Sequence, residues 1–83
     1  MLNSRFTLPK GASDEQIWDK ILESMPKDLT DIVDKNKSEI ISPYQGAKEF
    51  WIKSTDNNCI AFASIADSHD GEIEWSVYQE YLR

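Results

Sequence analysis

The chain has 83 residues, of which 40% are hydrophobic and 29% are charged, and its net charge is −6. This length allows one domain with one small core, and the charged fraction is typical of a globular chain, not a disordered one. No apolar run approaches the roughly 18 residues that span a membrane, and the N-terminal residues lack the apolar stretch of a secretory signal. From the length we expect a single domain over residues 1–83. Because the one cysteine excludes an internal disulfide, we expect a reducing location, the cytoplasm.

Acidic side chains dominate the C-terminal part of the chain. Residues 1–53 hold nine acidic and eight basic side chains, whereas residues 54–82 hold six acidic ones and no Lys or Arg. Such a surface serves solubility or attracts a basic partner. It also repels nucleic acids and anionic membranes, so we expect neither as a direct partner.

The first elements are a strand and a helix. Residues 4–8 alternate polar and apolar, which predicts a short strand before Pro9. Ser13 and Gln16 have the spacing of a capping box, which predicts the start of a helix. The helix is predicted over residues 13–25 because apolar positions recur at helical spacing, at Ile17, Trp18, Ile21, Leu22 and Met25.

Pro26 either ends or kinks the first helix, or is the first residue of a second helix. Its apolar face would be Leu29, Ile32 and Val33. In outline, two helices followed by a hairpin resemble a winged helix. The three Asp residues of the second helix and the wholly acidic hairpin argue against DNA binding.

Residues 38–44 are ambiguous, since two isoleucines favour a strand while Pro43 restricts it to a short or edge position. Residues 47–78 are predicted to form a three-stranded antiparallel meander. Its turns are expected at residues 55–58 and 67–71. The central strand is apolar on both faces, and the last strand alternates cleanly. The fold class expected is therefore α+β, with a short N-terminal strand, one or two helices and the meander in a two-layer sandwich.

Residues 67–71, Asp-Ser-His-Asp-Gly, are the segment most suggestive of chemistry. Asp67, His69 and Asp70 could hold a metal ion or carry a proton, but the same residue types form hairpin turns. The chain has no second histidine, and Cys59 lies at the start of an apolar strand, where a thiol is usually buried. We therefore expect no enzyme activity, no metal and no cofactor.

A protein-binding surface is the better candidate. Aromatic rings supply contact area and carboxylates supply register, and both are found in the C-terminal half. The alternative is that the rings are covered and belong to the core. The candidate partner-binding residues are Trp51, Asp67, Asp70, Glu72, Glu74, Tyr78, Glu80 and Tyr81.

The function expected from these features is that of a small acidic binding protein. It would act as an inhibitor of the immunity, antitoxin or phage-inhibitor type, docking on the basic surface of a nuclease or a nucleic-acid-binding protein. The alternative is a structural or regulatory accessory domain that forms a homodimer through a sheet edge or an exposed aromatic face. A third reading is a small metal protein or enzyme built on residues 67–70.

Overall fold

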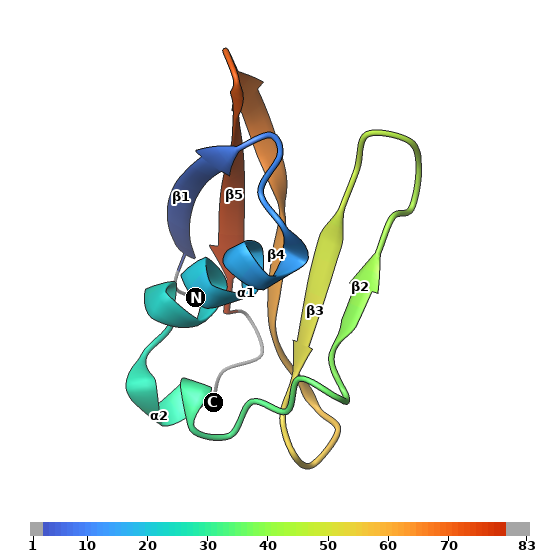
Figure 1. The fold of residues 1–83 in the computed structure, drawn as a ribbon. Coiled ribbons are helices and arrows are strands. Elements are labelled where there is room, and N and C mark those ends of the chain that lie inside the picture. The colour runs from blue at the N-terminus through green and yellow to red at the C-terminus, as the bar shows by residue number, and fades with distance from the viewer. Residues whose placement is uncertain (1–2, 80–83) are drawn as a thin grey trace.

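The computed structural model describes residues 3–79, apart from the side chains of residue 3 and residues 67–69. Five strands form one antiparallel sheet in the order β1-β5-β4-β3-β2, and two helices pack on one of its faces (Figure 1). The elements are β1 (Asn3–Pro9), α1 (Asp14–Ser24), α2 (Lys27–Thr30), β2 (Glu39–Ile41), β3 (Glu49–Lys53), β4 (Cys59–His69) and β5 (Glu72–Tyr78).

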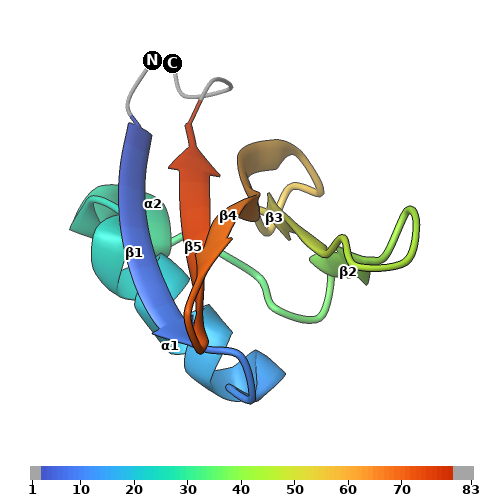
Figure 2. The same ribbon diagram turned by 90° about the horizontal axis from the view of Figure 1, so that it is seen from above.

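The α+β class is confirmed, and the predicted three-stranded meander is present as β3, β4 and β5, but the sheet has five strands because the N-terminal strand and the ambiguous segment both join it. The N-terminal strand is long enough to pair along the whole of β5, from Asn3 opposite Tyr78 to Pro9 opposite Glu72. The ambiguous segment contributes β2, a three-residue edge strand on β3. Seen from above, the helices lie beside β1, β5 and β4, while β2 stands beyond them (Figure 2). Ile40 is exposed for that reason, and Ile41 points to the opposite face of the sheet, so neither residue marks the strand by burial.

The first helix begins as predicted. The Ser13 backbone N–H donates to Gln16 Oε1 at 2.9 Å, and the Gln16 N–H donates to Ser13 Oγ at 3.2 Å, so the capping box is complete. Ile17, Trp18 and Ile21 are buried against the sheet. None of the helices in the described part of the chain is long and apolar enough to cross a bilayer.

The predicted second helix is reduced to a single turn after Pro26. Leu29 is buried as expected, but Ile32 is 41% exposed, so the predicted apolar face is wrong at that position. Ile32 is exposed because the backbone of residues 32–34 is no longer helical and instead forms hydrogen bonds with residues at the end of β3. The Thr55 N–H donates to the Ile32 carbonyl at 3.0 Å, and the Asp34 N–H donates to the Lys53 carbonyl at 2.9 Å.

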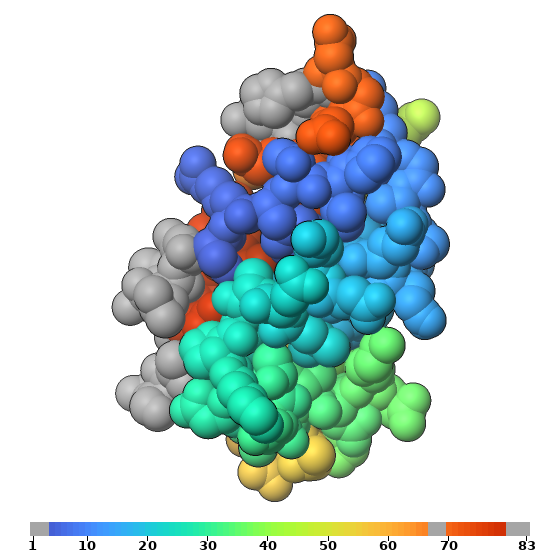
Figure 3. Space-filling model, turned by 60° about the vertical axis from the view of Figure 1, so that its left-hand side comes forward, coloured from blue at the N-terminus to red at the C-terminus, as the bar shows by residue number. Residues whose placement is uncertain are grey.

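The core between the helices and the sheet is built on a chain of aromatic contacts. Trp75 stacks on Phe6 at 6.5 Å between ring centroids and meets Phe50 edge-on at 5.5 Å, and Phe50 meets Trp18 of α1 at 5.5 Å. Ala61 and Ala63 of β4 are fully buried in the same cluster, where their small size lets the neighbouring groups approach. In the space-filling view, α1, α2 and β1 form one continuous surface (Figure 3). The β4–β5 turn lies at one end of that surface and the β3–β4 turn at the other.

The turn at residues 55–58 is confirmed, with Asn57 at a φ of 66°. The turn predicted over residues 67–71 is shorter than expected, because β4 continues to His69 and β5 begins at Glu72. Gly71 alone supplies the positive φ, at 72°. The register of β4 against β5 shifts between Ile65 and Ser68, and this irregularity lets the strand continue through the polar residues.

Candidate protein-binding surface

One face of the sheet carries no helix of the described chain, and we call it the helix-free face. Because side chains alternate along a strand, the residues between the buried positions point to it. Phe50, Trp75 and Phe6 mark the covered side. The helix-free face therefore holds Arg5, Thr7, Glu39, Ile41, Glu49, Trp51, Lys53, Phe62, Ser64, Glu72, Glu74, Ser76 and Tyr78.

Three rings form a continuous row across this face. Trp51 of β3 is the direct partner of Phe62 of β4, and Phe62 is the direct partner of Tyr78 of β5. The Trp51 and Phe62 centroids are 4.9 Å apart with the planes at 71°, and the Phe62 and Tyr78 centroids are 6.1 Å apart at 32°. All three side chains are half-buried. This aromatic row presents contiguous ring surface on a rigid sheet.

Beside the aromatic row lies a second row with small side chains at its centre. Ser64 of β4 pairs with Ser76 of β5, Glu49 flanks Ser64 on β3, and Arg5 flanks Ser76 on β1. We call Ser64 and Ser76 the serine row. Ser76 is only 2% exposed, and its Oγ has no hydrogen-bond partner among the described residues. A buried hydroxyl without a partner costs about 1–3 kcal/mol, so this atom needs an explanation.

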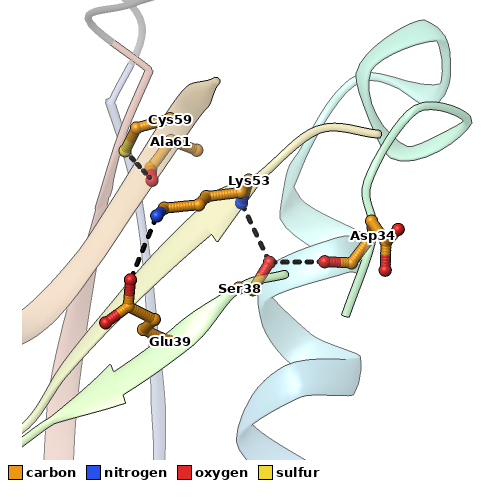
Figure 4. A network of polar contacts seen from close by, with 6 residues as sticks. All are labelled: Asp34, Ser38, Glu39, Lys53, Cys59 and Ala61. Atoms are coloured by element: carbon orange, nitrogen blue, oxygen red, sulfur yellow. Dashed lines mark hydrogen bonds and ion pairs between the residues drawn. The ribbon is translucent and has the colours of Figure 1, made fainter. Parts of the chain in front are cut away.

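The helix-free face carries four carboxylates and two basic side chains. One of the basic groups is already neutralised, because Lys53 Nζ lies 3.0 Å from Glu39 Oε2 (Figure 4). The Lys53 N–H also donates to Ser38 Oγ at 2.9 Å, and Ser38 Oγ donates to the Asp34 carbonyl at 2.9 Å. These bonds fasten β2 to β3 and to the segment that precedes it. The other charged side chains of the face are Glu49, Glu72, Glu74 and Arg5, so its net charge is negative.

Glu49 also positions the first ring of the aromatic row. Trp51 Nε1 donates to Glu49 Oε1 at 3.2 Å, within the same strand. This bond satisfies the indole N–H and leaves the second carboxylate oxygen, Oε2, for another donor. The ring is therefore oriented by a residue two positions earlier, which shares its face.

A small polar pocket of about 210 Å³ opens where β4 runs past the end of β3. Lys48, on its rim, forms an ion pair with Asp14 at the start of α1. Tyr44, also on the rim, is 72% exposed. The lining residues are Tyr44, Gly46, Ala47, Lys48, Glu49, Ser64, Ile65 and Ala66.

The chemistry at Cys59 does not favour a nucleophile. Its Sγ donates to the Ala61 carbonyl at 3.5 Å (Figure 4), and burial raises the pKa of the thiol. A nucleophilic cysteine needs the opposite shift. In residues 3–79, with the side chains of 67–69 left aside, no three His, Cys, Asp or Glu groups are placed to share a metal ion.

The structure brings together four of the eight candidate partner-binding residues. Trp51, Glu72, Glu74 and Tyr78 share the helix-free face. Asp70 is exposed in the β4–β5 turn at the end of the sheet. The side chain of Asp67, together with Glu80 and Tyr81, lies outside the described residues.

Sequence reasoning missed Phe62 and Glu49, which complete the surface. The signal was present in both cases. Phe62 alternates with the buried alanines of the central strand, and Glu49 lies two residues before Trp51. The acidic residues of 54–82, in contrast, do not all gather, since Asp56 and Asp70 lie in turns at opposite ends of the molecule (Figure 1).

Comparisons with known proteins add no assignment to this geometry. Neither the protein families, nor the curated proteins, nor the solved structures gave a match. The function is therefore inferred from the aromatic row, the serine row and the charges around them.

Proposed function

We propose that this chain is a small acidic non-catalytic binding protein that docks its helix-free face on a basic protein surface, in the manner of an inhibitor. The observation that carries the proposal is the aromatic row of Trp51, Phe62 and Tyr78, which lies beside carboxylates on a sheet face without a helix layer. A nuclease or a nucleic-acid-binding protein is the partner class that offers such a basic surface.

The row has the composition of an interface centre. Tyr and Trp dominate the residues whose truncation weakens protein complexes most, because a large rigid ring buries area at little entropic cost. The rings here are held by each other and by the sheet beneath, whose other side is core. Little ordering would be needed on binding, which favours affinity.

The carboxylates add direction. Glu72 and Glu74 are on the same face of β5, and Glu74 lies two positions from Ser76 along the strand. Glu72 is exposed and Glu74 is half-buried, and surface acids of this kind accelerate encounter with a positive surface and make binding sensitive to salt. They also present negative charge where a nucleic acid would present phosphate.

The test begins with identification of the partner. Tagged protein is incubated with lysate at low salt, bound proteins are eluted by a salt gradient, and they are identified by mass spectrometry. A basic protein released at moderate salt is then purified and its affinity measured directly.

Charge reversal decides whether the helix-free face is used. Glu72→Lys combined with Glu74→Lys is expected to weaken binding by at least tenfold and to flatten its salt dependence. The matched control is Asp19→Lys combined with Glu23→Lys, which changes the net charge equally on the outer side of α1. Equal affinity of the two double variants would refute the proposal.

The structure also gives a reason to retain self-association as a second candidate. Ile40 and Ile41 on the edge strand β2 are 41% and 36% exposed. An edge strand with exposed β-branched residues can pair with a second copy. Sedimentation of the wild-type chain and of Ile41→Lys over a hundredfold concentration range tests this reading, and a concentration-independent monomer would exclude it.

A further inference from the structure

We propose that the helix-free face contains a site for one guanidinium group, an arginine side chain of the partner, seated over Ser64 and Ser76 between the aromatic row and the carboxylates of Glu49 and Glu74. The inference rests on the proposed function, since it takes a basic protein as partner, and it names the side chain that the face selects.

The strand pairings enclose the serine row on three sides. Ser64 and Ser76 are direct cross-strand partners, so their side chains lie about 5 Å apart. Phe62 and Tyr78, two residues away on the same strands, bound the row with rings. Glu49 bounds it across β3, and Glu74 bounds it along β5. Ser76 is covered by its larger neighbours, so an incoming group reaches it once those side chains turn aside.

The Ser76 hydroxyl gives an independent reason to place a ligand here. It is buried on the helix-free side of β5, and its oxygen has no partner among the described residues. A hydroxyl oxygen accepts two hydrogen bonds, so a donor entering from the partner would satisfy an atom that no described residue bonds. Neighbouring side chains such as Arg5 and Tyr78 would have to turn aside to admit that donor.

These surroundings suit a guanidinium better than an ammonium. A guanidinium is planar, stacks on a ring, and offers five donors that can reach a carboxylate and a hydroxyl together. The ring of Tyr78, the hydroxyl of Ser76 and the carboxylates of Glu49 and Glu74 supply these three kinds of contact. A lysine ammonium is a point charge that would pair with the carboxylates, but it would gain less than a guanidinium from the ring and the hydroxyl.

The fourth side of the site is occupied by this chain's own arginine. Arg5 is the direct partner of Ser76 on β1 and is exposed. Its positive charge opposes an incoming guanidinium and lies within reach of the same groups. Removal of Arg5 is therefore expected to strengthen the binding of a cation, which is the reverse of what loss of an ordinary surface side chain would do.

The experiment compares nona-arginine with nona-lysine, by calorimetry at low salt and by amide chemical shifts. We expect nona-arginine to bind roughly three- to tenfold more tightly. The amides of Ser64, Ser76 and Tyr78 should shift most. Arg5→Ala should raise the affinity for nona-arginine several-fold, and Tyr78→Leu should abolish the preference.

Ser76→Ala separates the functional role from a structural one, with Ser42→Ala in the exposed β2–β3 connection as control. Loss of an unsatisfied hydroxyl should raise the melting temperature of the free protein while weakening nona-arginine binding. A stability gain without a loss of binding would overturn the site.

The two proposals fail differently. If both peptides bind equally and only Glu72 and Glu74 matter, the guanidinium site is refuted and the acidic docking face stands. If neither peptide binds in low salt, both proposals are refuted.

Discussion

The two faces of the sheet each carry a tryptophan, and truncating them separately tests whether the aromatic row is available for binding. Trp75 is 2% exposed and contacts Phe6 and Phe50. Trp75→Ala should therefore cost about 3–5 kcal/mol, the range for a fully buried large aromatic. That is most of the stability expected for a domain of this size, so we expect little folded protein at 37 °C.

Trp51→Ala should be far milder. The side chain is half-buried, it contacts one ring, and its N–H bond to Glu49 is partly exposed. An aromatic pair contributes about 0.5–1.5 kcal/mol and a hydrogen bond about the same, which gives a total near 2 kcal/mol. Since 1 kcal/mol corresponds to about 4–8 °C for a domain of this size, the melting temperature should fall by about 8–16 °C.

Urea unfolding followed by far-UV circular dichroism measures both variants, because that signal comes mainly from the backbone. Trp51→Ala should retain a cooperative transition and the wild-type spectrum while losing affinity for the partner. If Trp51→Ala is as destabilising as Trp75→Ala, the aromatic row is part of the core, and the argument for a binding face is refuted.

Three further predictions concern single positions. Ser13→Ala should lower stability by about 1 kcal/mol through loss of the cap on α1, and an unchanged urea midpoint would contradict the capping box. Gly71→Ala should cost about 1 kcal/mol because its φ is 72°, and thermal melts of the variant test this. Burial raises the pKa of Cys59, so iodoacetamide should react more slowly with the folded protein than with the urea-unfolded chain at pH 8, and equal rates would count against this burial. Because the pKa of Cys59 is higher in the folded protein than in the unfolded chain, the protonated thiol contributes fully to stability at pH values below the pKa of the unfolded chain. This contribution is lost as the pH rises through the higher pKa of the folded protein.

The parts of the fold that the sequence predicts are those with strong local signals. The capping box at Ser13 depends on neighbouring residues alone and is confirmed, and so is the last strand. The half-buried alternation predicted for that strand is only partial, because Ser76 on the opposite face is as buried as Trp75 and Val77. The strand at Ile40 and Ile41 could not be predicted in the same way. It is exposed on both sides and is defined by its pairing with β3, a partner that follows eight residues later.

The candidate site shows the same division. Trp51, Glu74 and Tyr78 were recognisable as polar-face residues because their strands alternate. Their alignment with Phe62 into one row depends on the registers of three strands, and register is set by tertiary packing. That the Ser76 hydroxyl has no hydrogen-bond partner among the described residues depends on the folded structure and has no counterpart in the pattern of the chain.

The order of the strands has a consequence for how the protein reaches its native state. β5, the last described strand, lies between β1, the first, and β4. Until β5 is in place, β1 has no partner in the sheet and the core lacks Trp75, so the N-terminal strand must wait for residues some seventy positions later. Such long-range closure slows folding, and it leaves no shorter N-terminal piece with a complete sheet. We expect folding in one concerted step after β5 has been synthesised, with the edges of β1 and β4 exposed to other chains until then.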